Sequence, residues 1–212
     1  MKVDKRTRAK ALSAPPAELI LLHGADAGGI SDASARLLAG AEIARLTPQD
    51  IKDDPGSLHV RGGDLFAPSQ AVRVDDADDT LTKPVEALLA DGGPDVRTVL
   101  RAGQLKASSR LRKLVEGHKQ AVAILMPAPD HGERVALARS AFDAAGQHVG
   151  SHALDALAGR LPPDSAAARQ EVEKVLLYAD GDEIDVACVE RAIADAASQS
   201  IDEAIAGAFD GD

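Results

Sequence analysis

Short apolar segments recur along the first part of the chain and alternate with longer polar stretches that are compatible with helices. The apolar segments cover residues 19–22, 41–46, 71–74, 96–100 and 121–126. Strands that alternate with helical segments favour a parallel sheet, because the crossover between two parallel strands usually contains a helix that packs on the sheet. The pattern therefore predicts an α/β fold, a parallel sheet with flanking helices.

The pattern changes after residue 126, where Pro127 and Pro129 interrupt the chain and no further strand is indicated. Helical spacing of apolar residues predicts helices at about 132–145, 151–160 and 165–179. Asp185 is placed to cap a fourth helix, and Ser200 with Glu203 has the form of a capping box ahead of a fifth. We therefore expect an α/β domain over residues 1–128 and a small helical domain over residues 129–212.

Composition and charge narrow the range of protein classes to which the chain can belong. Aromatic residues make up only 2% of the chain, so the core must consist of aliphatic side chains, as in a helix-rich fold. The net charge of −10 repels phosphate backbones and argues against a free-standing nucleic-acid binder. The lone cysteine, Cys188, excludes an intramolecular disulfide and fits a reducing compartment. Since no apolar run is long enough to span a membrane, we expect a cytoplasmic protein.

A glycine-rich segment follows the first predicted strand and precedes a predicted helix. Gly24, Gly29 and Ser31 have the spacing of a phosphate-binding loop, but Ile30 stands where that loop needs a lysine. Without the ammonium group, the β- and γ-phosphates of a nucleotide lose a neutralising charge. The segment is either a degenerate nucleotide loop or an ordinary strand–helix connection. In both cases we expect no bound cofactor.

Four aspartates after the third predicted strand are the other candidates for nucleotide chemistry. Asp75, Asp76, Asp78 and Asp79 do not form the buried acidic pair that holds magnesium, and we interpret them as a solvated loop. His148 and His152 are four residues apart, a spacing that metal sites use, but Gly150 between them argues against one shared helix face. The sequence thus predicts no metal site and no catalytic residue.

A local basic segment stands out in this acidic chain. Lys106, Arg110, Arg112 and Lys113 lie in a stretch whose only acid is Glu116. Such a segment can approach DNA phosphates, although a solvated helix face is the more common outcome for a run of charges. Ser109 and Arg110 are interpreted as the start of this helix and a surface arginine.

Several segments in order resemble the bacterial DNA polymerase III delta subunit. The resemblance extends from about Leu19 to the end of the chain and is carried by residues 19–26, 64–67, 71–74, 105–113, 169–178 and 184–189. It implies an AAA+ core, similar to P-loop NTPases, followed by a helical lid. The family continues with a collar domain that joins the other clamp-loader subunits, and this sequence stops at Asp212, about where the collar would begin.

The resemblance also implies a function. The chain is expected to be a non-catalytic clamp-loader subunit, not an enzyme by itself, that binds and opens the sliding clamp during DNA replication and meets DNA only within the complex. Leu65 and Phe66 match the family's apolar wedge, which inserts into a pocket of the clamp. Gly62 and Gly63 depart from the family, whose members continue a helix there.

Two alternatives stay open at this point. Without the resemblance, Leu65 and Phe66 would be expected to pack into the core beneath their loop. The chain as a whole has a second interpretation as a small P-loop-like nucleotide-binding enzyme with an atypical loop. Ile30 separates the two functions, because tight nucleotide binding needs the missing lysine.

Overall fold

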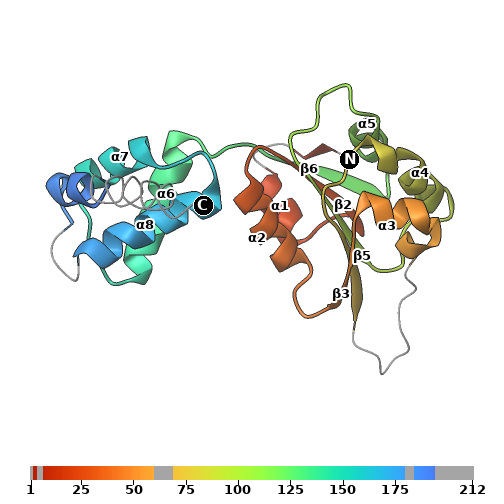
Figure 1. The fold of residues 1–212 in the computed structure, drawn as a ribbon, viewed down its shortest axis with the longest axis horizontal. Helices are drawn as coiled ribbons and strands as arrows, with labels where there is room; N and C mark the ends of the chain where they lie inside the picture. Colours follow the sequence, from red (N-terminus) through yellow and green to blue (C-terminus); the bar gives the residue numbers. More distant parts are fainter. Residues whose placement is uncertain (1, 4–6, 60–68, 180–183, 194–212) are drawn as a thin grey trace, which may run out of the picture. The chain divides into compact units, whose positions relative to one another are not determined.

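A computed structural model describes residues 2–3, 7–59, 69–179 and 184–193 of the chain (Figure 1). The chain divides into two compact units, Met1–Ala128 and Pro129–Asp212. Leu65 and Phe66 lie outside the described residues, as does the helix expected after Ser200.

The first unit is built on a parallel sheet of six strands in the order β1-β6-β2-β5-β4-β3. The strands are β1 (Lys2–Val3), β2 (Leu19–Gly24), β3 (Glu42–Leu46), β4 (Gln70–Val74), β5 (Arg97–Ala102) and β6 (Ala121–Met126). The connection from β2 leads away to the edge strand β3, whereas β6 lies on the opposite side of β2. The direction of winding therefore reverses at β2.

Helices cover both faces of this sheet (Figure 1). One face carries α1 (Arg8–Ser13) and α2 (Ala27–Leu37), and the other carries α3 (Pro48–Asp53), α4 (Thr82–Ala90) and α5 (Arg110–Gly117). The short 3₁₀ turns η1 (Pro55–Leu58) and η2 (Asp79–Leu81) precede β4 and α4. Since successive side chains of a strand point to opposite faces, Leu19 and Leu21 of β2 join one core and Ile20 and Leu22 join the other.

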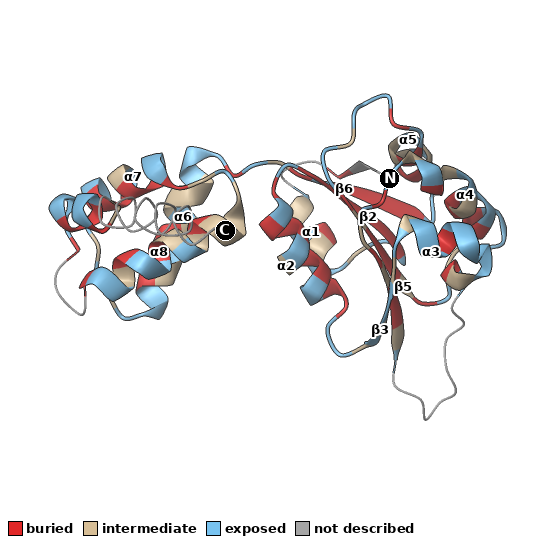
Figure 2. Cartoon of the chain, viewed as in Figure 1, coloured by how far each residue is buried: buried red, intermediate tan, exposed pale blue. Residues whose placement is uncertain are grey.

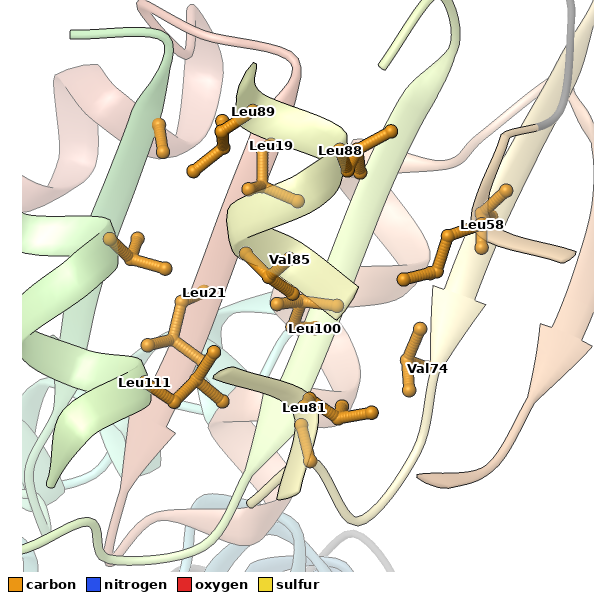
Figure 3. Packing of buried hydrophobic residues seen from close by; sticks show 14 of the residues in the cluster. Leu19, Leu21, Leu58, Val74, Leu81, Val85, Leu88, Leu89, Leu100 and Leu111 are labelled. Atoms are coloured by element: carbon orange, nitrogen blue, oxygen red, sulfur yellow. The ribbon is translucent and has the colours of Figure 1, made fainter. Parts of the chain in front are cut away.

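The larger core lies between β2, β4 and β5 and the helices α4 and α5 (Figure 3). Leu21, Leu100, Val85 and Leu111 meet there and are fully buried. Figure 2 shows the same division, with buried residues along the strands and exposed residues on the outer sides of the helices. Both faces of the central strands β2, β5 and β6 are thus largely covered, which explains why these strands are nearly continuous apolar runs, whereas the edge strand β3 is exposed or half-buried.

The second unit is helical. It contains α6 (His131–Ala144), α7 (Ser151–Arg160), α8 (Ser165–Ala179) and a further helix at 186–193. Asp130 begins α6 with a capping box, and Asp185 accepts a hydrogen bond from the Cys188 N–H at 2.7 Å, as expected for a cap. The core of this unit includes Phe142, Leu157 and Val172.

The fold class predicted from the sequence is confirmed: a parallel sheet with flanking helices is followed by a helical part. β1 was not predicted, because its two residues lie in a basic stretch and pair only with β6. β5 runs beyond its apolar segment to Ala102, since the charged Arg101 near its end finds an acidic partner on the neighbouring turn.

Candidate functional site

A small hollow lies at the carboxyl ends of the parallel strands β2, β4 and β5. In open parallel sheets, ligands bind at the carboxyl ends of the strands where the winding reverses. That point is the end of β2 in this unit. The hollow has a volume of about 180 Å³ and is lined by Gly24, Ala27, Ile30, Asp75, Asp76, Arg101, Ala102 and Gly103. This is the candidate site.

The loop after β2 forms one wall. Gly24 has φ +152°, and a side chain there would collide with the Met126 carbonyl oxygen of β6. The next turn is closed by Asp26, whose N–H donates to Met126 O at 3.2 Å. The Asp26 side chain caps α2 by accepting from the Gly29 N–H at 2.9 Å. Only glycine tolerates the close approach at position 24.

Ile30 and Ser31 lie on different faces of α2. Ile30 is 4% exposed and packs into the core that contains Ile20 and Leu22, while it also lines the hollow. Ser31 is exposed and does not line the hollow. The structure therefore brings Gly24 and Ile30 together at the site, but not Ser31, the residue that would meet a magnesium ion in a phosphate-binding loop.

Asp75 forms the opposite wall and is held by two arginines. Its Oδ1 lies 2.8 Å from Arg101 Nη1, and its Oδ2 lies 2.8 Å from Arg73 Nη2. All three side chains are partly buried, which strengthens such charge-assisted pairs. The carboxylate is thus already engaged by two cations, and no group of metal-ligating side chains is found among the residues described.

The acidic turn is more ordered than the solvated loop expected from the sequence. Asp78 caps η2 by accepting from the Thr80 N–H at 2.9 Å. Asp79 accepts from Ser109 Oγ at 2.5 Å and from the Leu111 N–H at 3.1 Å. These bonds, with the one from Ser109 first, lower the pKa of Asp79 below its ordinary value. Asp76 and Asp78 are exposed, as expected for a solvated loop, whereas Asp75 and Asp79 are half-buried and are bonded to partners further along the chain.

The basic residues of the segment 106–113 differ in how far they are exposed. Ser109 caps α5 through the Arg112 N–H at 3.2 Å, so Arg110 begins the helix as predicted. Lys106, Arg110 and Lys113 are exposed. Arg112 is different, because its Nε donates to Glu116 Oε1 at 2.8 Å and its side chain is only 16% exposed. Arg112 therefore differs from the other three in pairing with an acid of its own helix, and its possible contact with DNA stays a prediction.

No protein-family model and no curated protein sequence matches the chain. Solved structures do resemble it. The RuvB Holliday junction branch migration motor of Thermotoga maritima shares 16% identity at a TM-score of 0.57, over 90% of this chain and 69% of that one. Domain III of the T. maritima replication initiation protein DnaA shares 15% identity at a TM-score of 0.52, over 90% and 89%.

A third similar structure is the DNA clamp loader delta protein of Bacillus subtilis, with 12% identity and a TM-score of 0.56. The match covers 88% of this chain but only 61% of the Bacillus protein. At such identities, the likeness establishes architecture alone. The chain has the AAA+ fold.

Sequence reasoning did not single out Arg101, which lines the candidate site, or Asp26, which caps α2 at the end of the same loop. Asp26 precedes Gly29 by three positions, the spacing of a helix cap, and that signal was available. Arg101 gave no signal, since its partner Asp75 lies 26 residues earlier. Leu65 and Phe66, the predicted clamp contacts, lie in the stretch 60–68 that the structure does not describe.

The two histidines do not form a metal site. His148 lies in the loop before α7 and His152 within α7, so they do not share a helix face as a metal spacing would require. His148 lines a separate hollow of about 330 Å³ in the second unit, together with Arg139, Phe142 and Leu154. Within the described part of the chain, no helix has the length and apolar character needed to cross a membrane.

Proposed function

We propose that this chain is a non-catalytic AAA+ subunit of a clamp loader, which binds and opens the sliding clamp during DNA replication. The observation that carries the proposal is the nucleotide site, where Ile30 is buried in place of the lysine and Asp75 is held by Arg73 and Arg101. Support also comes from the resemblance in sequence and from the likeness of fold to the Bacillus clamp loader delta protein.

Loss of catalysis follows from the charges at the site. Phosphoryl transfer needs cations that neutralise the phosphates and a carboxylate that holds magnesium. The lysine is replaced by a hydrocarbon, and an aspartate at the end of β4 that is paired with two arginines has little charge left for a metal ion. An AAA+ domain of this kind can serve as a rigid scaffold for binding a partner protein.

The proposed partners are the sliding clamp, the other clamp-loader subunits and, within that complex, DNA. For the clamp, we propose Leu65 and Phe66 as the contact, on the basis of the sequence resemblance. Adjacent large apolar residues that fill a partner's pocket act as binding hot spots. For DNA, we propose contacts with the exposed Lys106, Arg110 and Lys113. Their positive charges can pair with phosphates, although the chain as a whole has a net charge of −10.

The alternative function, a small P-loop-like nucleotide-binding enzyme, is favoured by one observation, the hollow at the carboxyl ends of β2, β4 and β5. Its volume of about 180 Å³ is below the range of about 300–1,000 Å³ usual for sites that enclose small molecules. The hollow therefore gives this alternative less support than the missing lysine gives the first proposal.

The deciding experiment measures binding of the full chain to the sliding clamp of the same organism. Replacing Leu65 and Phe66 together by alanine should weaken binding by about 2 kcal/mol or more. A matched control replaces Leu177 and Tyr178, another adjacent apolar pair, which is exposed by 81% and 42%. The control should bind as the wild type does. Equal binding by the folded Leu65→Ala/Phe66→Ala variant would reject these contacts, and no clamp binding by the wild type would reject the proposed function.

A phosphate-release assay separates the two functions. The proposal predicts no ATP turnover by the wild-type chain, because the lysine is replaced by Ile30 and Asp75, the carboxylate at the end of β4, is paired with two arginines. Turnover that disappears on replacing Ser31 by alanine would favour the enzyme instead.

A further inference from the structure

The strand β3 forms one edge of the sheet, and among the described strands only β4 pairs with it. Every residue of β3 is exposed or half-buried (Figure 2). Glu42 and Leu46 bond through their backbones to residues next to β4, at 2.7 and 2.9 Å. Because alternate residues of a strand turn their backbone groups to the same side, Ile43 and Arg45 direct theirs away from β4. Such an edge can accept a further strand from a partner.

A row of arginines crosses the sheet face beside this edge. Arg45 of β3 lies opposite Arg73 of β4 in register, and Arg101 of β5 joins the row through Asp75. Each arginine comes two residues after an apolar residue that belongs to, or packs against, the core beneath α2, so all three side chains emerge on that face. Since α2 packs mainly on β2, β5 and β6, Arg45 stays exposed.

The charges in this row do not balance. The Asp75 carboxylate is shared, with Oδ1 at 2.8 Å from Arg101 and Oδ2 at 2.8 Å from Arg73. Among the described residues no acid pairs with Arg45, so three arginines face one carboxylate. Like charges at opposite positions of neighbouring strands repel each other. A further anion beside Arg45 would therefore relieve its repulsion with Arg73.

We propose that the β3 edge and the arginine row bind an extended acidic segment of a partner protein. The segment adds to β3 as a strand and places a carboxylate against Arg45, where a charge-assisted hydrogen bond can form. Alternate side chains of an added strand point to this face, which separates its carboxylates along the row. This inference goes beyond the proposed function and does not depend on clamp binding.

Nucleic acid fits this surface less well. Glu42 begins β3 and Asp76 follows β4, and both are exposed. Phosphates follow one another closely along a nucleic-acid strand, so a strand laid along the row would bring some of them near these carboxylates. A peptide with spaced carboxylates avoids this repulsion. The charges therefore favour a protein segment as the occupant.

The test titrates the full chain with a short peptide that alternates glutamate with valine, followed by NMR. We expect Arg45→Gln to bind this peptide about fivefold more weakly than the wild type, which is the upper range for an exposed charge pair. The matched control is Arg110→Gln, the same change at an exposed arginine of α5 on the other face of the sheet. It should bind as the wild type does. A peptide that alternates glutamine with valine should bind the wild type more weakly than the glutamate peptide.

Amide hydrogen exchange of the wild type shows whether the peptide adds to the edge. The N–H groups of Ile43 and Arg45 should exchange more slowly when the peptide is present, because they gain hydrogen-bond acceptors. This measurement needs no variant and decides the point even if a variant fails to fold. Arg45→Gln should melt no lower than the wild type, since it removes a repulsion with Arg73.

The proposal is overturned if Arg45→Gln and Arg110→Gln bind the glutamate peptide equally well, or if the peptide leaves exchange at Ile43 and Arg45 unchanged. A single-stranded DNA oligomer of the same total charge is the competing probe. If it binds more tightly than the peptide and Arg45→Gln weakens that binding, the row is a nucleic-acid site instead. Absence of clamp binding by the wild type would contradict only the proposed function.

Discussion

The hydroxyl of Ser109 donates to Asp79 at 2.5 Å and thereby joins the start of α5 to the turn that follows β4. The same carboxylate accepts the Leu111 N–H at 3.1 Å. The first turn of α5 is thus capped twice, locally by Ser109 and across the sheet edge by Asp79. The exposed Lys106 and Arg110 lie next to this pair along the chain.

This pair predicts an acid-dependent contribution to stability. The pKa of Asp79 is lowered in the folded chain, first by the Ser109 hydrogen bond, from an ordinary value of 3.8. The stabilisation is therefore complete above that value and is lost as the pH falls below it. Asp79→Asn should be less stable than the wild type at pH 7, and the difference should shrink from about pH 5 downward. Urea unfolding over a pH series measures this.

Ser109→Ala serves as the companion variant, because it removes the largest cause of the lowered pKa as well as the local cap. We expect a loss of about 1 kcal/mol at neutral pH. A constant difference between Asp79→Asn and the wild type at every pH would contradict the assignment.

Substitution of Gly24 is expected to destabilise the fold strongly. Its φ of +152° disfavours other residues, and a Cβ would collide with Met126 O in β6. Gly24→Ala should cost about 3 kcal/mol or more. The control is Gly40→Ala, where φ is +80° but nothing lies within 4 Å of an added Cβ. Thermal melts should show the smaller loss at Gly40, and equal losses would mean that the contact with β6 is not decisive.

Leu100 tests the core in Figure 3. Its side chain is 0% exposed between the sheet and α4, so Leu100→Ala should destabilise the chain by about 2–5 kcal/mol through lost burial and a new cavity. Leu177→Ala makes the same chemical change at a side chain that is 81% exposed, and should cost less than about 0.5 kcal/mol. Denaturant midpoints compare the two, and similar losses would place Leu100 outside a tightly packed core.

Glu18 and Arg97 form a weaker interaction at the start of β5. Two bonds join them, at 2.8 and 3.1 Å, and the hydrogen bond from Arg97 is the main cause of the lowered pKa of Glu18. Both side chains are substantially exposed, so Glu18→Gln should cost less than about 1 kcal/mol. Added salt should reduce the difference, as should acidification below the ordinary pKa of 4.5. An increase with salt would show that the loss has another cause.

The sequence by itself determined the kind of most elements from residue 19 onward, although β1 and α1 were not predicted. Runs such as 121–126 favoured buried strands of a sheet covered on both faces, because apolar side chains on both sides of a strand need two layers to cover them. The helices predicted at about 151–160 and 165–179 are confirmed as α7 and α8. The sequence also showed directly that Gly24 and Gly29 have the spacing of a phosphate-binding loop and that Ile30 replaces its lysine, because this motif consists of residues close together along the chain.

Only the tertiary structure decided which charges meet at the site. Asp75 and Arg101 are 26 residues apart, and Asp79 and Ser109 are 30 apart, yet the order of strands brings each pair within hydrogen-bond distance at the edge of the sheet. The structure also shows that Arg112 is half-buried and bonded to Glu116, whereas Lys106, Arg110 and Lys113 are exposed. Periodicity specifies which face of an element is buried, but a pairing between distant polar side chains depends on how the elements are ordered in space.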